Sequence, residues 1–452
     1  MGTQDSATAT NPHSVTNFGA KGDGTTDDTQ SIQEAVNAGG DIFFPAGVYL
    51  ISETIELVSN VKFYTEPKTS VVLKFCGQTF IGFHGQNVVN IIFENLTLAN
   101  YAQAQGIKQS ILQDSTSKSV TAYPVYTTDQ MLSFGKSQNI QLINCRFNWK
   151  NGVGWLPTKA DAISAYPKGL YGGLRFAQCS DINIDGCTFQ NSARITTMPP
   201  GKEPCHSLFF KNNLLQCVEI ENSGQQNVII QNCKVENIIT AFRIMNSNNT
   251  KIINNTITDT LDTSIFDRST QKDPTYNRLI SNNTFTNIGK SAIKIMDVNT
   301  SQGQANNGLV LNNSIENWAL HTFSAAILSA NHYAQGGEGT QPTAAEKANN
   351  LKIYKNTIKE TSAQSGGKVF QIFNTLNVMI MDNTVKLMDK GPDNPCGGSN
   401  KNEIMQGCEV GRITGNTFNS NQPWYIKDCT NITIDNNTVT PGPISVETSS
   451  SS

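Results

Sequence analysis

Apolar and polar residues alternate along most of the chain, and the alternation recurs in one eight-residue pattern. It reads apolar, x, apolar, x, x, Asn or Cys, x, apolar, as in VIIQNCKV, VMIMDNTV and ITIDNNTV. A period of two without helical stretches predicts short β-strands throughout, hence an all-β protein. The sixth position of successive copies is Cys145, Cys187, Asn213, Cys233, Asn255, Asn283, Asn313, Asn356, Asn383, Asn416 and Asn437.

The spacing of these copies predicts a solenoid. The shortest intervals are 20 to 22 residues, and the longer ones read as loops inserted into the same unit. A unit of that size cannot bury its apolar face alone, so successive units must stack. Parallel stacking places equivalent residues about 4.8 Å apart, where Asn amides can bond the next coil. We therefore expect a parallel β-helix of about twelve coils held by an asparagine ladder.

The N-terminal segment, residues 15–52, follows a different pattern: strand, glycine-rich turn, helix and strand. The helix is expected over about residues 26–38, with Thr26, Asp27 and Asp28 at its N-terminus and two glycines after its end. Its apolar side would cap the open end of the first coil. Residues 1–14 are expected to form a flexible arm, 15–440 one domain and 441–452 a disordered polar tail.

The composition argues against several classes of binding partner. Charged residues make up 15% of the chain and the formal net charge is −3, so nucleic acid is not an expected partner. No run approaches 18 apolar residues, and the first 14 residues lack the apolar stretch of a signal peptide, so no membrane association is expected. The ten cysteines contain no CxxC pair and predict neither a disulfide framework nor a zinc site.

The segment NFGAKGDGTTDDTQSIQEAVNAGGDIFFPAGVYLI resembles the opening motif of the pectate-lyase-like superfamily, particularly its bacteriophage tailspike depolymerases. The coils from about residue 87 to 440 resemble the right-handed parallel β-helix of that superfamily. The resemblance implies a polysaccharide substrate, a homotrimer and an extracellular or virion location. It leaves the reaction open, because the superfamily holds lyases, hydrolases, epimerases and binding proteins.

Charged residues recur at one outward position in the middle coils. Aligning the apolar residues of VEIEN, AFRIM, SIFDR and SAIKI places four charged side chains in one column, which Arg175 from the preceding coil extends. The four are Glu219, Arg243, Asp267 and Lys294. A solvated salt-bridge ladder would explain the column, and so would a substrate groove, because this face often forms the groove in the family.

The column suggests glycoside hydrolysis as the leading reaction. Glu219 and Asp267 lie two coils apart, about 9.6 Å, near the upper end of the separation in inverting glycosidases. Glu221 is a substitute carboxylate on the same face, and Arg243 would keep one carboxylate ionised. The predicted substrate-binding residues are Arg243, Lys294, Arg175, Asp297, Trp155, Tyr171 and Tyr276.

Two other functions stay open. The first is β-elimination from a uronate, with Arg243 or Lys294 acting on the substrate and Ca²⁺ held by Glu219 and Asp267. Hydrolysis would need no cofactor or metal. The second is a non-catalytic adhesin or receptor-binding spike. The sequence does not identify the sugar, the linkage or the source of the protein.

Overall fold

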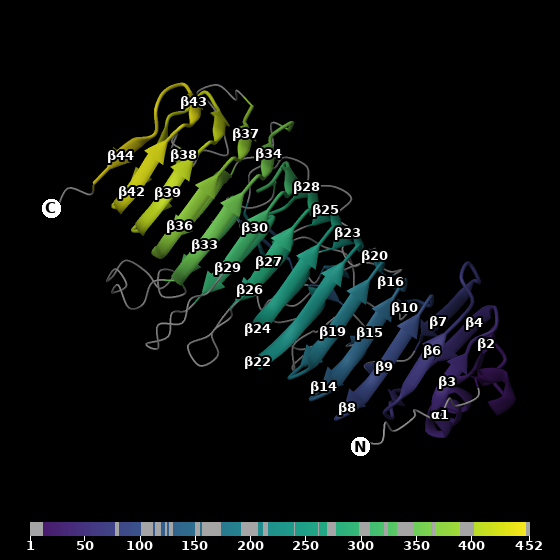
Figure 1. Ribbon diagram of the computed structural model, residues 1–452. Helices are drawn as coiled ribbons and strands as arrows, with labels where there is room; N and C mark the ends of the chain where they lie inside the picture. Colours follow the sequence, from purple (N-terminus) through teal and green to yellow (C-terminus); the bar gives the residue numbers. More distant parts are fainter. Residues whose placement is uncertain are drawn as a thin grey trace, which may run out of the picture.

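The chain forms an elongated parallel β-helix whose first and last strands lie at opposite ends (Figure 1). The computed structural model describes residues 12–76, 81–100, 112–113, 119–122, 124–125, 130–149, 154–155, 173–190, 207–210, 216–238, 240–260, 262–268, 277–297, 308–320, 324–331, 348–362, 365, 367–388 and 402–448. The predicted fold class is thus confirmed. Within the described ranges, the third face contains fourteen strands, one per coil, rather than the twelve coils expected.

Each coil runs through three faces in order. The first face comprises β5 (Ile55–Glu56), β8 (Ile81–Gln86), β14 (Gln130–Gly135), β18 (Leu174–Ala177), the N-terminal parts of β22 (Gln216–Gln231) and β24 (Thr240–Ile253), β26 (Ile265–Arg268), β29 (Ile293–Asp297), β32 (Ala325–Asn331), β35 (Lys368–Phe373), β38 (Asn402–Gln406), β41 (Trp424–Lys427) and β44 (Ser445–Glu447).

The second face comprises β1 (His13–Ser14), β3 (Gly40–Phe43), β6 (Val61–Tyr64), β9 (Val89–Glu94), β15 (Gln138–Ile143), β19 (Ser180–Asp185), the C-terminal parts of β22 and β24, β27 (Arg278–Ser281), β30 (Gly308–Leu311), β33 (Ala348–Tyr354), β36 (Thr375–Met381), β39 (Glu409–Thr414) and β42 (Thr430–Asp435). Because β22 and β24 pass from the first face to the second without a break, the two faces form one hydrogen-bonded network.

The third face comprises β2 (Asp23–Asp27), β4 (Gly47–Ile51), β7 (Val71–Phe75), β10 (Thr97–Asn100), β16 (Arg146–Trp149), β20 (Thr188–Gln190), β23 (Lys234–Ile238), β25 (Thr256–Thr260), β28 (Thr284–Ile288), β31 (Ser314–Glu316), β34 (Thr357–Lys359), β37 (Thr384–Lys386), β40 (Thr417–Asn419) and β43 (Thr438–Thr440). Two small sheets pair β11 (Leu112–Gln113), β12 (Ser119–Ala122) and β21 (Ser207–Phe210), and β13 (Pro124–Val125) with β17 (Gly154–Trp155).

The interior is a stack of equivalent side chains. Phe63 and Phe93 lie in successive coils with ring centroids 4.6 Å apart, and Phe147 and Phe189 repeat the arrangement at 5.0 Å. Alternate residues of each strand enter this stack, because successive side chains in a strand point to opposite faces of the sheet. The apolar residues of the period-two pattern therefore face the interior of the solenoid, and the polar residues between them face outward.

The asparagine ladder is present at the turn between the second and third faces. Nδ2 of Asn313 donates to Oδ1 of Asn356 in the next coil at 2.9 Å, and the backbone N–H of Asn313 donates to the same oxygen at 2.9 Å. The same bonds link successive coils from Asn255 to Asn437. The left-handed residue of these turns is the one before the ladder position, such as Asn312 at φ 53°. Asn213 lies outside the described residues.

Removing one ladder side chain should cost stability. In an Asn356→Ala variant, the backbone N–H of Asn313 and the carbonyl of Val310 lose their bonds to the side chain, each at an interior position. Leaving such groups unpaired costs about 1–3 kcal/mol each, so the thermal unfolding midpoint should fall clearly. The exposed neighbour Thr357 provides the control, and Thr357→Ala should change little. Equal midpoints for the two variants would contradict the structural role of the ladder.

The helix is shorter than predicted. Helix α1 (Thr29–Ala38) begins three residues late, because residues 23–27 form β2 on the third face. The side chain of Asp28 makes no helix-capping bond, and its carboxylate instead accepts the backbone N–H groups of Lys21 and Gly22 at 2.6 and 3.1 Å. Asp28 therefore fixes the glycine turn rather than the helix.

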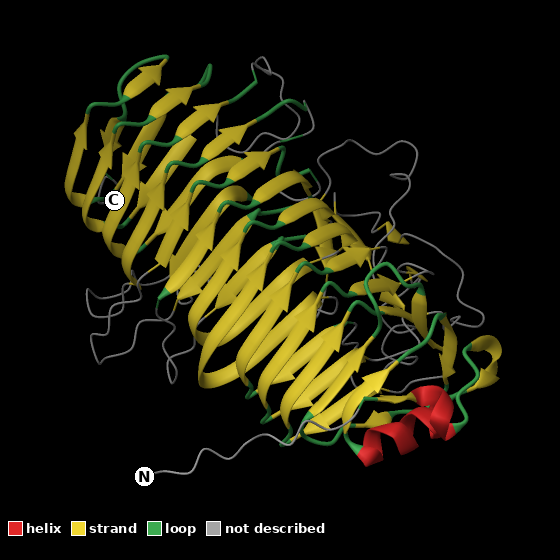
Figure 2. Cartoon of the chain, turned by 45° about the vertical axis from the view of Figure 1, so that its right-hand side comes forward, coloured by secondary structure: helices red, strands yellow, loops and turns green. Residues whose placement is uncertain are grey.

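Helix α1 buries Ile32, Ala35 and Val36 and lies at the end of the solenoid that holds the first strands (Figure 2). Its role as a cap remains a prediction. Among the described residues, no helix has the length and apolarity needed to cross a membrane.

Two terminal predictions need correction. His13 and Ser14, expected in a flexible arm, form β1 and pair with β3. Residues 445–447, expected in a disordered tail, form β44 and pair in parallel with β41. Backbone pairing with the neighbouring coil accounts for both.

Candidate active site on the first face

The register of the first face brings most of the predicted column together. Arg175 of β18 pairs with Glu219 of β22, which pairs with Arg243 of β24. The next two positions of this outward row are Phe266 of β26 and Lys294 of β29. Of these strands, β22, β24, β26 and β29 are labelled in Figure 1 and follow one another along the solenoid. The side chain of Glu219 is outside the described part of the structure.

The predicted position of Asp267 is wrong. Asp267 pairs in register with Ile244 and Ile295 and faces the interior, where it is fully buried, while Phe266 takes the outward position. A shift of one residue reverses which side chains of a strand point inward. The expected pair of outward carboxylates, Glu219 and Asp267, is therefore not formed.

Asp267 faces inward because the second face supplies it with a partner. Nε of Arg278, at the start of β27, lies 2.8 Å from Oδ2 of Asp267, and Nη2 donates to Oδ1 at 3.0 Å. Both side chains are at most 1% exposed. A buried carboxylate is tolerated when a guanidinium binds both of its oxygens in this way.

Arg278 pairs in register with Gly308 of the neighbouring coil, where a β-carbon would make only an ordinary contact with Nη1, at 3.6 Å. Arg278 was not considered as a candidate in the sequence, since its partner lies across the segment 269–276.

Three basic side chains gather on the outer surface of β24, β26 and β29. Burial, followed by repulsion from Lys290, lowers the pKa of Lys294 to about 8. Burial and then the charge of Arg243 lower the pKa of Arg268, which lies one outward position beyond Phe266. The charge of Arg243 thus adds to the cost of charging Arg268, and the charge of Arg268 adds to the cost of charging Lys294.

Phe266 contributes an aromatic surface to the same cluster. The ammonium nitrogen of Lys294 lies 5.2 Å from the centroid of the Phe266 ring, within the range of a cation–π contact. The ring separates Arg243 from Lys294 along the row. The site therefore combines cations with one apolar face, a combination suited to an acidic sugar ring.

The other predicted carboxylates fall into three positions. Glu221 pairs in register with Met245, one outward position beyond Glu219, and Asp297 ends β29, paired with Asn331. The side chains of Glu221 and Asp297 are not among those described. Asp262 precedes β26, is 23% exposed and lies 3.6 Å from Nζ of Lys290.

The predicted aromatic platforms remain untested by the described residues. Trp155 belongs to β17, which pairs antiparallel with β13 in a separate small sheet. Tyr171 and Tyr276 lie outside the described residues. Phe266 is the aromatic residue that sequence reasoning missed, because it was assigned to the interior.

The calcium site considered for elimination is not formed as predicted, since Asp267 is committed to Arg278 and faces inward. Among the described residues, no cluster of three or more His, Cys, Asp or Glu side chains is arranged to hold a metal ion. We derive no step through a metal.

The fold and the outward charged row define a parallel β-helix protein whose first face presents basic and acidic positions around one aromatic ring. The chain belongs to the rhamnogalacturonase A/epimerase, pectate lyase-like family, whose model matches residues 13–265, more than half of its 452 residues. This confirms the resemblance inferred from the opening motif.

Individual relatives are more distant. The pre-neck appendage protein of Bacillus phage phi29 is 35% identical over 103 residues, which cover 21% of this chain and 12% of that protein. The chain thus matches only a small part of the length of that relative.

Solved structures agree in fold. The tailspike of Escherichia coli bacteriophage HK620 in complex with pentasaccharide has a TM-score of 0.57 at 12% identity, covering 96% of this chain and 78% of that one. The family 28 exopolygalacturonase of Yersinia enterocolitica has a TM-score of 0.55 at 12% identity, covering 93% and 78%. At such identities these likenesses establish the fold alone.

Proposed function

We propose that the protein is a depolymerase that binds an acidic polysaccharide along the first face and cleaves it there. The observation that supports this most directly is the basic cluster of Arg243, Arg268 and Lys294 around the Phe266 ring. A uronate carboxylate bound among these cations would offset their mutual repulsion, which adds to the effect of burial in lowering the pKa values of Arg268 and Lys294. Neutral sugars would not gain this electrostatic stabilisation.

Among reactions, β-elimination fits the described side chains best. An elimination requires neutralisation of the uronate carboxylate and a base for the C5 proton, and Lys294 with a pKa of about 8 is partly neutral near neutral pH. In this proposal Arg243 and Arg268 hold the carboxylate, and the C5 proton passes to Nζ of Lys294. The C4–O4 bond then breaks as the C4=C5 double bond forms, and the leaving oxygen takes a proton from solvent.

Hydrolysis is the second candidate. It retains two outward carboxylate positions from the prediction, Glu219 and Glu221, in register with Arg243 and Met245. Asp262 is a further carboxylate of the same region, partly exposed and near Lys290. The exopolygalacturonase neighbour is in keeping with this reaction but supports only the fold.

The place of action is also part of the proposal. The phage appendage relative and the tailspike neighbour favour a virion or extracellular location and a polysaccharide partner. A homotrimer, as expected from the tailspike resemblance, remains a proposal. A non-catalytic spike is the alternative if binding occurs without cleavage.

The test compares acidic and neutral polymers. Wild-type protein is incubated with polygalacturonate, alginate, hyaluronate and dextran, and ultraviolet absorbance and reducing ends are followed together. Elimination should produce an unsaturated, absorbing product from at least one acidic polymer and none from dextran, whereas hydrolysis would produce reducing ends alone. Binding without any released oligosaccharide would instead identify an adhesin.

The site assignment is tested with Arg243→Ala. Loss of a charge-assisted contact to the carboxylate should lower kcat/KM about 10- to 100-fold, equivalent to about 1.4–3 kcal/mol. Lys251→Ala, an exposed lysine of β24 on the second face, is the matched control and should keep wild-type activity. Equal activity of both variants would place the site elsewhere.

A further inference from the structure

The second face of the solenoid carries a cavity that is separate from the row of charged residues on the first face. The cavity, of about 420 Å³, opens over the beginnings of β27, β30 and β33. This volume lies within the range of about 300–1,000 Å³ typical of small-ligand sites. Nothing in the proposed reaction uses it.

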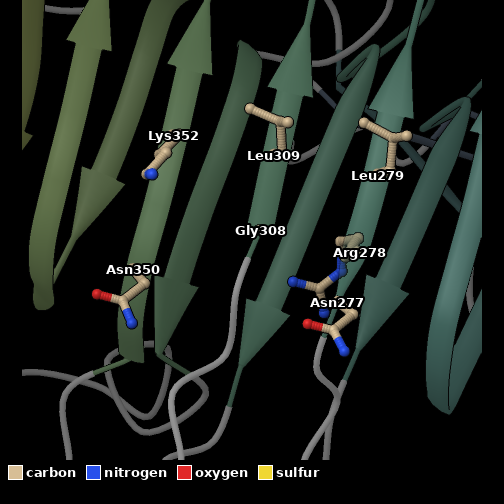
Figure 3. A pocket seen from close by; sticks show the side chains of 7 residues that line it. All are labelled: Asn277, Arg278, Leu279, Gly308, Leu309, Asn350 and Lys352. Atoms are coloured by element: carbon tan, nitrogen blue, oxygen red, sulfur yellow. The ribbon is translucent and has the colours of Figure 1, made fainter.

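The floor and rim of this cavity differ in chemistry. Figure 3 shows Leu279 and Leu309 on neighbouring strands, Lys352 on β33, and Asn277 and Asn350 near the strand beginnings. The leucine side chains form an apolar floor, the two amides offer donors and acceptors, and Lys352 adds an exposed cation. Among the described residues that line the cavity, none is acidic.

The floor is held by the buried ion pair. Arg278 precedes Leu279 and also borders the cavity, and its guanidinium is fixed from the inside by Asp267. Its conformation is therefore set before any ligand arrives, which reduces the cost of binding.

We infer that this cavity is a second, non-catalytic binding site for one uronate unit of an acidic polysaccharide. The apolar C–H face of a pyranose ring suits the two leucines, its hydroxyl groups suit the amides, and its carboxylate suits the ammonium group of Lys352. Asp267 compensates the charge of Arg278, so the exposed charge of the described lining is the ammonium group of Lys352, which favours an acidic sugar over a neutral one.

A site on this face would retain the polymer while the first face acts. Two sites on one chain that engage the same polymer raise its effective concentration at each. The inference concerns binding alone and does not depend on whether the first face cleaves by elimination, by hydrolysis or not at all.

The cavity offers a matched pair of lysines. Lys251, Leu279, Leu309 and Lys352 form one outward row along four adjacent strands. Both lysines are exposed, but only Lys352 lines the cavity. Replacing each with alanine separates binding in the cavity from general attraction to the face.

The experiment is a methyl NMR titration of full-length protein labelled at leucine, with sodium D-glucuronate and D-glucose as probes. Arg243→Ala is used as the background, so that the outcome is independent of the first face. We expect saturable shifts of the Leu279 and Leu309 methyl signals with glucuronate, and an affinity at least fivefold lower for glucose. Lys352→Ala should weaken glucuronate binding at least fivefold and Lys251→Ala should not.

Three outcomes would overturn the inference. These are the absence of saturable shifts, equal affinity for glucose, and equal effects of the two lysine variants. Methyl shifts that depend on protein concentration without sugar would also overturn it, by identifying a second copy of the chain as the occupant.

Discussion

Replacing Lys294 with methionine should reduce the rate of polymer cleavage by about 10²- to 10⁴-fold, the usual contribution of a general base. The methionine keeps the length and packing of the side chain over Phe266 and removes the amine. Cleavage is measured as initial rate at saturating acidic polymer. Lys251→Met on the second face is the control and should behave as wild type.

The pH dependence of kcat is an independent test of Lys294 as the general base. The base must be neutral, and with a pKa of about 8 Lys294 is about one tenth neutral at pH 7 and about nine tenths at pH 9. Wild-type kcat should therefore rise through pH 8 and level off above it. A Lys294→Met variant with the wild-type rate, or a rate that falls as pH rises through 8, would exclude Lys294 as the base.

A loss of cleavage in Lys294→Met would not be explained by unfolding of the variant. Lys294 titrates at about 8 in the folded protein, against 10.5 for an exposed lysine. The unfolded chain therefore binds more protons between these values, and stability rises with pH across that window. Below pH 8 the charged side chain lowers the free energy of unfolding, so Lys294→Met should be at least as stable as wild type at pH 7.

Replacing Asp267 with alanine should lower the free energy of unfolding by about 3–5 kcal/mol, because it leaves the Arg278 guanidinium charged and buried. Denaturant-induced unfolding measures the change. The double variant Asp267→Leu with Arg278→Met removes both charges and should recover most of the loss. A double variant less stable than Asp267→Ala would contradict this account of the ion pair.

Asp267→Asn separates stability from catalysis. The amide preserves the shape of the side chain and one acceptor oxygen. The variant should therefore have a lower thermal unfolding midpoint than wild type but be folded at temperatures below that midpoint. Since Asp267 faces away from the first-face surface, cleavage by the folded variant should stay within a few-fold of wild type. A folded variant that binds polymer without cleaving it would restore Asp267 as a catalytic carboxylate.

The sequence was sufficient to predict the features that recur from coil to coil. It was not sufficient to predict the orientation of Asp267, which depends on a single partner elsewhere in the chain. The ladder position recurs in the coils from Cys145 onward, so its turn, its burial and its neighbours follow from the spacing. The same repetition placed Arg175, Glu219, Arg243 and Lys294 at equivalent positions of their strands.

The strand IFDR was ambiguous in a way that local pattern cannot resolve. Ile265 and Phe266 are both apolar, so either can begin the inward series. The decision depends on Arg278, eleven residues after Asp267 in the chain. This signal does not lie within the strand, and an inward acidic residue violates the expected pattern unless its partner is known.

The ladder also has an electrical direction. From Asn255 onward each side-chain oxygen accepts from the preceding coil and each amide nitrogen donates to the following one, so the amide dipoles add along the long axis. At Cys187 and Cys233 the thiols bond to backbone carbonyls at 3.1–3.7 Å, and this series of side-chain amides is absent. The solenoid is therefore electrically asymmetric: its C-terminal half contains a continuous row of aligned dipoles, and the oxygen end of that row lies beside the coils that hold the basic cluster.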